Sequence, residues 1–215
     1  ARLQVVGDGE LKLADGKVRA TGLKLDRGNF SSNLAIANFK LGALNNELSP
    51  QLRAGKISGD FNVARNIDKL TSAAIEANGN GRLNLANGGE VGANNIKIRA
   101  GQWQSDLAFR GLKLGVVNQD LPLPIQAGRL FGKFRAAGDL SDPQLAKIQA
   151  SGNGKIRSVL GGNIQVNNLN LDRGKWQSKV IVERLNIGEL AKFAPKSLSE
   201  TISAAAPSQN RLTGQ

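Results

Sequence analysis

The stretch RGKWQSKVIVERLNIG, residues 173–188, is the third version of a phrase that this chain contains three times. AGQWQSDLAFRGLKLG occupies residues 100–115, and RGNFSSNLAIANFKLG occupies residues 27–42. The turn glycine of the phrase recurs at a step of 73 residues, as Gly28, Gly101 and Gly174. Self-similarity at a fixed period is the sequence signature of a repeat architecture.

Other positions keep the same step. The aromatic residue of the phrase recurs at Phe30, Trp103 and Trp176, and the serine at Ser32, Ser105 and Ser178. Upstream, the triplets GDG, GNG and GNG match with a slip of one residue, at residues 7–9, 79–81 and 152–154. The chain therefore repeats a whole unit of about 73 residues.

The spacing predicts three units, at residues 1–76, 77–149 and 150–215, the last one truncated. In the third unit we expect a longer, partly helical connection near residues 189–209. The sequence does not begin with Met, and we expect it to be an interior or processed piece of a longer array.

Within each unit the apolar residues alternate with polar or small ones. In the middle unit the apolar-face series is Val91, Ala93, Ile96, Ile98, Trp103, Ser105, Leu107 and Phe109. Such alternation is typical of strands with one apolar and one polar face. Turn signals such as DRG, RAG and NGG separate the runs, so we expect four or five strands per unit. We expect polar loops around residues 45–51 and 118–126, and helix only in residues 187–193 and 197–206.

The predicted fold class is all-β: an elongated repeat array built from a curled antiparallel sheet with an apolar interior, a β-taco. About ten inward side chains per unit, each with roughly 50 Å² exposed, would cost on the order of 12 kcal/mol if left in water. Three arrangements can cover them: a dry sandwich or solenoid, a face-to-face dimer, or a trough filled by an apolar ligand. The predicted groove-lining residues are Leu23, Leu25, Phe30, Leu34, Ile36, Ile96, Ile98, Trp103, Leu107, Phe109, Leu169, Leu171, Trp176, Val180 and Val182.

The composition argues against catalysis and against metal binding. The chain has no His and no Cys, so the repeated serines lack a histidine base, and metal ligands are lacking as well. We expect no enzyme activity, no cofactor and no metal. The serines are expected to be small residues beside the aromatics, and each serine is expected to bond to a backbone group. The GDG and GNG triplets are expected to be β-bulges rather than phosphate loops, because they lack the strand-to-helix context.

The net charge of +12 is compatible with nucleic acid, an anionic membrane surface or acidic partners. Aromatic residues make up 4% of the chain and alternate toward the apolar face, which disfavours a nucleic-acid partner. A basic outer wall attracted to anionic headgroups explains the charge more simply. The sequence contains no apolar run of about 18 residues that would span a membrane as a helix, and the absence of Cys is compatible with an oxidising compartment.

The phrases GQWQSDLAFRGLKLG and GKWQSKVIVERLNIGEL, at residues 101–115 and 174–190, resemble the TamB family, especially its cyanobacterial and plastid-type members. The resemblance implies a long envelope protein in the periplasm or intermembrane space, anchored in the inner membrane and reaching an Omp85-type outer-membrane partner. It implies a β-taco fold that moves phospholipid or other acyl-chain lipids between membranes, a role in outer-membrane protein assembly, and protein import for plastid relatives. The anchor and the partner-binding region are not in this sequence.

Two other functions use the same pattern. A closed β-repeat could act as a structural spacer or adhesin-like linker whose apolar residues pack only on one another. A trough could also bind unfolded β-segments as a chaperone, through its apolar face and its free edges.

Overall fold

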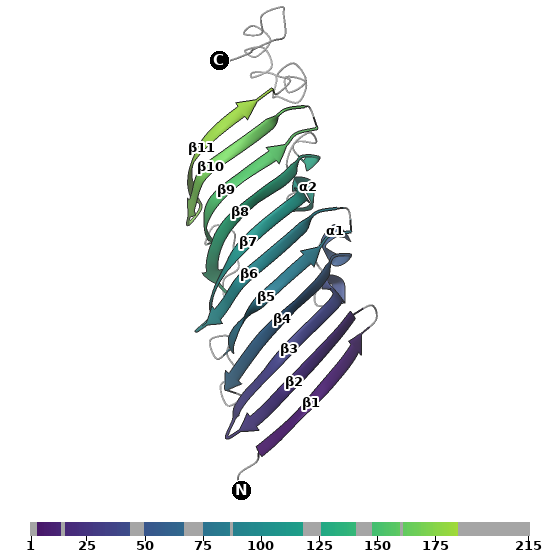
Figure 1. Ribbon diagram of the computed structural model, residues 1–215. Coiled ribbons are helices and arrows are strands. Elements are labelled where there is room, and N and C mark those ends of the chain that lie inside the picture. The colour runs from purple at the N-terminus through teal and green to yellow at the C-terminus, as the bar shows by residue number, and fades with distance from the viewer. Residues whose placement is uncertain are drawn as a thin grey trace, which may run out of the picture.

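The described part of the chain forms an eleven-stranded antiparallel sheet in which each strand pairs with its neighbours in sequence (Figure 1). The computed structural model describes residues 4–13, 16–43, 50–66, 75–86, 88–117, 126–140, 148–159 and 161–184. The strands are β1 (Gln4–Leu13), β2 (Gly16–Asp26), β3 (Asn29–Lys40), β4 (Lys56–Asn66), β5 (Ile75–Asn84), β6 (Glu90–Arg99), β7 (Gln102–Lys113), β8 (Arg129–Asp139), β9 (Gln149–Arg157), β10 (Asn163–Asp172) and β11 (Lys175–Glu183). The prediction of an all-β antiparallel sheet is confirmed, and the described residues place four strands in each of the first two 73-residue steps and three in the third.

Short helical turns lie at one end of the strands (Figure 1). They are η1 (Leu41–Ala43), α1 (Pro50–Arg53) and α2 (Leu114–Val117). The predicted loop over residues 45–51 is therefore wrong at its end, because Pro50 begins α1. The prediction that helix occurs only near the C-terminus is also wrong, since α1 and α2 lie earlier in the chain. The predicted helices at residues 187–193 and 197–206 lie outside the described residues, as do residues 45–49 and 118–125 of the predicted loops.

The repeated phrase begins at a two-residue hairpin turn. The turns join β2 to β3, β6 to β7 and β10 to β11, and both central residues of each turn have positive φ. These residues are Arg27 and Gly28, Ala100 and Gly101, and Arg173 and Gly174. Positive φ at both positions is the requirement of a type I′ turn, whose twist matches that of the strands it connects. The glycine recurs because this turn requires it.

A β-bulge lies opposite each glycine triplet, on β2, β6 and β10, so the prediction that the triplets themselves form the bulges is wrong about the strand that carries them. The register between paired strands shifts between Gly7 and Gly9, between Gly79 and Gly81, and across the β9–β10 pair opposite Gly152 and Gly154. The bulged residue has a left-handed backbone with φ of 59°, 53° and 53°, at Gly22, Asn95 and Asn168. The three bulged residues are 73 positions apart.

Two side chains hold each bulge. The middle residue of the triplet accepts a hydrogen bond from the N–H of the bulged residue: Asp8 from Gly22 at 2.8 Å, Asn80 from Asn95 at 2.9 Å, and Asn153 from Asn168 at 2.7 Å. The repeated serine, on the next strand, donates to the carbonyl of the residue that precedes the bulged one. Ser32 donates to Thr21 at 3.3 Å, Ser105 to Asn94 at 2.9 Å, and Ser178 to Asn167 at 3.0 Å. The prediction that the serines bond to a backbone group is confirmed.

The flanking glycines of a triplet make room for a phenylalanine ring on the preceding strand. Phe61 lies directly opposite Gly79 in the β4–β5 pair, and Phe134 lies opposite Gly152 in the β8–β9 pair. A Cβ added at Gly79 would meet the Asp60 carbonyl oxygen and would lie 2.9 Å from the Phe61 Cα. The ring therefore lies over backbone that only glycine can provide.

The core is small and lies at one end of the strands. Leu85, Leu112 and Val116 are buried, and Leu52 of α1 packs against them with residues of β5 to β8. Among the described residues no large side chain is fully buried. The two helical turns thus cover one end of the apolar side chains, and within the described ranges no second layer covers the others.

We expect Gly79→Ala to destabilise the protein by about 1–3 kcal/mol, because the added methyl group overpacks against β4. Gly7 is the matched control, since it holds the same place in the first triplet and a Cβ there would meet nothing within 4 Å. Urea unfolding measures both variants. Equal losses for Gly79→Ala and Gly7→Ala would refute the packing explanation.

We expect Ser105→Ala and Asn80→Ala each to cost about 1 kcal/mol, because each removes one hydrogen bond that holds the bulge at Asn95. Both bonds hold one backbone feature, so the double variant should depart from additivity by at least about 0.5 kcal/mol. A double-mutant cycle in urea unfolding measures this coupling. Strict additivity would mean that the two bonds act independently.

Candidate functional site

One face of the sheet carries a continuous row of apolar and small residues. Residues directly opposite each other on neighbouring strands have their side chains on the same face. One such row crosses β1 to β10 through Leu11, Val18, Ile36, Gly59, Gly81, Ala93, Leu107, Phe134, Gly152 and Leu169. We call the side of the sheet that bears this row the apolar face.

The register brings the predicted groove-lining residues together on this face. The same aromatic pairing recurs at each type I′ hairpin: Leu25 opposite Phe30, Ile98 opposite Trp103, and Leu171 opposite Trp176. Further lining residues follow at alternate positions, including Leu34 opposite Phe61 and Leu107 opposite Phe134. The side chain of Trp176 lies outside what the structure describes. Whether these residues contact a ligand stays a prediction.

The apolar face is half-buried. On β5 and most of β2 the residues alternate between half-buried on the apolar face and exposed on the other face. Toward the end of the sheet the exposure rises, to 46% for Val180 and 55% for Val182. No second sheet layer lies against this face among the described residues, so that part of the chain does not form a dry sandwich.

Among the residues of the described strands, one cation lies on the apolar face. Arg65, near the end of β4, is directly opposite Phe30 on one side and Ile75 on the other. Its Nε is buried and has no hydrogen-bond partner in the described structure. A buried polar group without a partner is costly, which makes this nitrogen a candidate donor to a bound anion. Sequence reasoning missed it, because the β3–β4 register is not readable from a single sequence.

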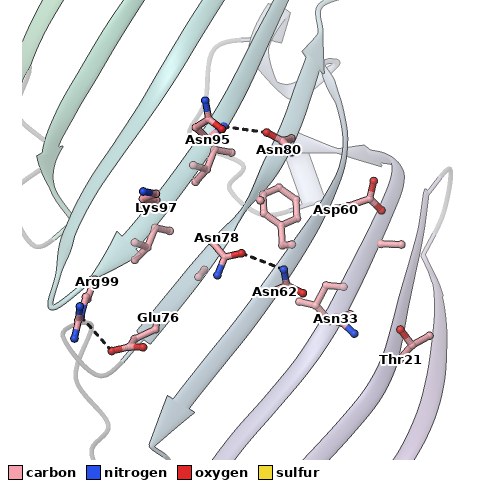
Figure 2. A pocket seen from close by; sticks show the side chains of 17 residues that line it. Thr21, Asn33, Asp60, Asn62, Glu76, Asn78, Asn80, Asn95, Lys97 and Arg99 are labelled. Atoms are coloured by element: carbon pink, nitrogen blue, oxygen red, sulfur yellow. Dashed lines mark hydrogen bonds and ion pairs between the residues drawn. The ribbon is translucent and has the colours of Figure 1, made fainter.

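The opposite face carries a polar hollow that sequence reasoning also missed. Its volume is about 880 Å³, and Figure 2 shows its lining, drawn from β2 to β6. Across the strands, Asn33, Asn62, Asn78 and Lys97 stand opposite one another in register. The Asn62 Nδ2 donates to the Asn78 Oδ1 at 3.0 Å. Arg99 also pairs with Glu76 at 3.6 Å, and these two cross-strand contacts favour a role in holding the strands together.

Hydrogen bonds and ion pairs on the polar face lower the pKa of two carboxyl groups. A hydrogen bond from Asn95 and a second one from Arg135, at 2.8 and 3.0 Å, lower the pKa of Asp106. A hydrogen bond from Lys17, whose Nζ lies 2.9 Å from the carboxylate, lowers the pKa of Glu10. Asn95 is also the bulged residue, so Asp106 is linked to the bulge.

The described residues offer no cluster of metal-binding side chains. They contain no group of three or more His, Cys, Asp or Glu side chains that could coordinate an ion. None of their helices has the length and apolar character needed to cross a bilayer.

The chain was compared with protein-family models, with curated proteins and with solved structures, and none of these comparisons gave a match.

We expect the protein to lose stability as the pH falls below about 4, and Asp106 to contribute to that loss. Its pKa is lower in the folded state than in the unfolded state. Its stabilising effect is therefore present above the unfolded-state pKa and disappears as the pH falls through the folded-state value. Asp106→Asn should be less stable at neutral pH and should show a shallower pH dependence in urea unfolding. Parallel pH profiles for the two proteins would contradict this assignment.

Proposed function

We propose that the apolar face shields the acyl chains of lipids and carries them along the sheet. The observation that supports this best is the uncovered row from Leu11 to Leu169, which continues across ten strands without a polar break. A layer of lipid chains would cover this face where none of the described residues does. The sheet then acts as an open trough, curled around its ligand as the β-taco form requires.

The energetics of transfer fit a protein without catalytic groups. An acyl chain that leaves a bilayer for water loses about 0.8 kcal/mol per methylene. A continuous apolar wall removes most of that cost. With strands about 4.8 Å apart, eleven strands extend on the order of 50 Å. Several such lengths in series would be needed to bridge two membranes.

Arg65 suggests that the lipid carries a negative charge. A guanidinium near the end of an internal strand, at the margin of the apolar face, is suited to pair with a phosphate or carboxylate at the end of an acyl chain. The net charge of +12 would favour anionic lipids in the same way. The cargo class is therefore an anionic amphiphile such as a phospholipid.

The resemblance to the TamB family gives this proposal its setting. In that setting the chain is part of an envelope protein in the periplasm or intermembrane space, anchored in the inner membrane. It would transfer phospholipid, or support outer-membrane protein assembly, with an Omp85-type partner bound by other parts of the protein.

The second candidate is a structural spacer. The phenylalanine rings that lie on glycines and the paired bonds at each bulge stiffen the sheet without any ligand. Native mass spectrometry after lipid extraction distinguishes the two functions. A stable, ligand-free monomer that does not take up added phospholipid would favour the spacer.

We expect a photo-crosslinking amino acid at Leu107 or Val180 to form lipid adducts in the presence of phospholipid vesicles, because both positions lie on the apolar face. Ala108 and Lys179 are matched controls, since each is a chain neighbour on the opposite face. Mass spectrometry detects the adducts. Labelling at Ala108 and Lys179 with none at Leu107 and Val180 would reject the conduit.

A further inference from the structure

Six basic side chains gather around one aromatic ring on the polar face of β7, β8 and β9, which are neighbours in the sheet (Figure 1). Phe131 lies on this face, because the next residue, Gly132, lies opposite Phe109 of the apolar face. It is an exception to the prediction that the aromatic residues alternate toward the apolar face. We call this group the basic patch, and it consists of Arg110, Lys113, Arg129, Phe131, Lys133, Lys155 and Arg157.

The register of these strands places like charges directly opposite one another. Lys113 is opposite Arg129 in the β7–β8 pair, and Arg129 is opposite Arg157 in the β8–β9 pair. Within the described part of the chain, Arg110 pairs with Glu90, and the other five cations have no ion pair. Like charges in direct cross-strand register destabilise a sheet. A bound anion would remove this repulsion.

The repeat itself does not require this patch. One 73-residue step earlier, a basic residue occupies only three of the six corresponding places. At the other places the residues are Ala37, Asp60 and Asn84, and Ser58 takes the place of the ring. Both steps form the same four strands, so the additional charge is not needed to build the sheet.

Two of the cations are held in place within the patch. The Arg129 Nη1 donates a hydrogen bond to the Gly111 carbonyl oxygen at 3.1 Å. The Arg157 guanidinium lies over the Phe131 ring, 4.8 Å from its centroid, in a cation–π contact. A guanidinium that is already held loses little freedom when it binds, and its planar fork matches a phosphate group. The two arginines are therefore preorganised for phosphate.

We propose that the basic patch docks the protein on a membrane surface rich in anionic phospholipid. The negative potential of such a surface attracts Lys and Arg side chains. The patch is an area rather than a line, because it extends on the order of 10 Å across three strands and about 13 Å along β8. This arrangement matches the phosphates of a bilayer surface, which are spread in two dimensions.

A nucleic acid fits the patch less well. Proteins bind single strands largely through exposed aromatic side chains on which the bases stack. The Phe131 ring is half-buried, and Arg157 lies over its face. The tip of the ring lies against Gly111, where an added Cβ would be 3.5 Å from the Phe131 Cζ. The ring therefore holds an arginine in place instead of offering a platform for a base.

Co-sedimentation with vesicles of phosphatidylcholine and phosphatidylglycerol in equal parts tests the docking. We expect the protein to bind these vesicles, and Lys133→Gln/Lys155→Gln to bind at least about tenfold more weakly. Each cation near an anionic surface contributes roughly fivefold to binding, and this double variant removes two of them.

Lys24→Gln/Lys97→Gln is the matched control, since it removes the same charge from the polar face of β2 and β6, outside the patch. We expect this control to lose less than about threefold in binding, because charges away from the contact are screened by salt. In the described structure none of the four lysines has a hydrogen bond or an ion pair. Both double variants should therefore unfold in urea as the unchanged protein does.

Three results would overturn the proposal. The first is equal binding to vesicles of phosphatidylcholine alone, which carry no net negative charge. The second is an equal loss for the two double variants, because the effect would then follow from net charge and not from the patch. The third is tighter binding to a single-stranded oligonucleotide that depends on Lys133 and Lys155, which would make a nucleic acid the partner.

This inference does not rest on the proposed lipid function, because docking uses the polar face and acyl chains would use the apolar face. A soluble fatty acid reaches the apolar face without any docking. We expect Lys133→Gln/Lys155→Gln to bind such a fatty acid as the unchanged protein does. Failure of the docking is therefore distinguishable from failure of the conduit.

Discussion

The hydrogen bonds that hold each β-bulge keep the apolar side chains on one face of the sheet. In a regular strand, side chains alternate between faces, and a shift of one residue moves all the following ones to the other face. The apolar series of β6 jumps from Ala93 to Ile96, which would break the alternation. The bulge at Asn94 and Asn95 absorbs the extra residue, and Ile96 lies again on the apolar face, opposite Gly79. The serine and the triplet asparagine fix the bulge from both sides.

This constraint explains why the phrase is repeated as a whole. Its glycine forms the type I′ turn, its aromatic residue pairs across the hairpin, and its serine holds the bulge one strand away. The triplet upstream supplies the second bond to the bulge and the room for a phenylalanine. Each of these parts depends on the register that the others set, so all of them recur together. The apolar face that the described strands leave uncovered is a consequence of building a single sheet in this way.

Much of this could be predicted from the sequence. Alternation gave the strands and their faces, and the jumps from Ala20 to Leu23 and from Val166 to Leu169 are a local signal of the bulges. The polar hollow and Arg65 could not be predicted, because both depend on which residues of distant strands stand opposite one another. The turns α1 and α2 have four residues each, which is too short for a helical period to show in the sequence.

The central claim is that the apolar face receives acyl chains. A fatty acid with a nitroxide near its methyl end would report this directly through paramagnetic broadening of methyl NMR signals. The account predicts strong broadening of Leu34, Ile96 and Leu107, with little effect on Ala35 and Ala108 of the polar face. Broadening of Ala35 and Ala108 with the leucine and isoleucine signals unchanged would contradict it.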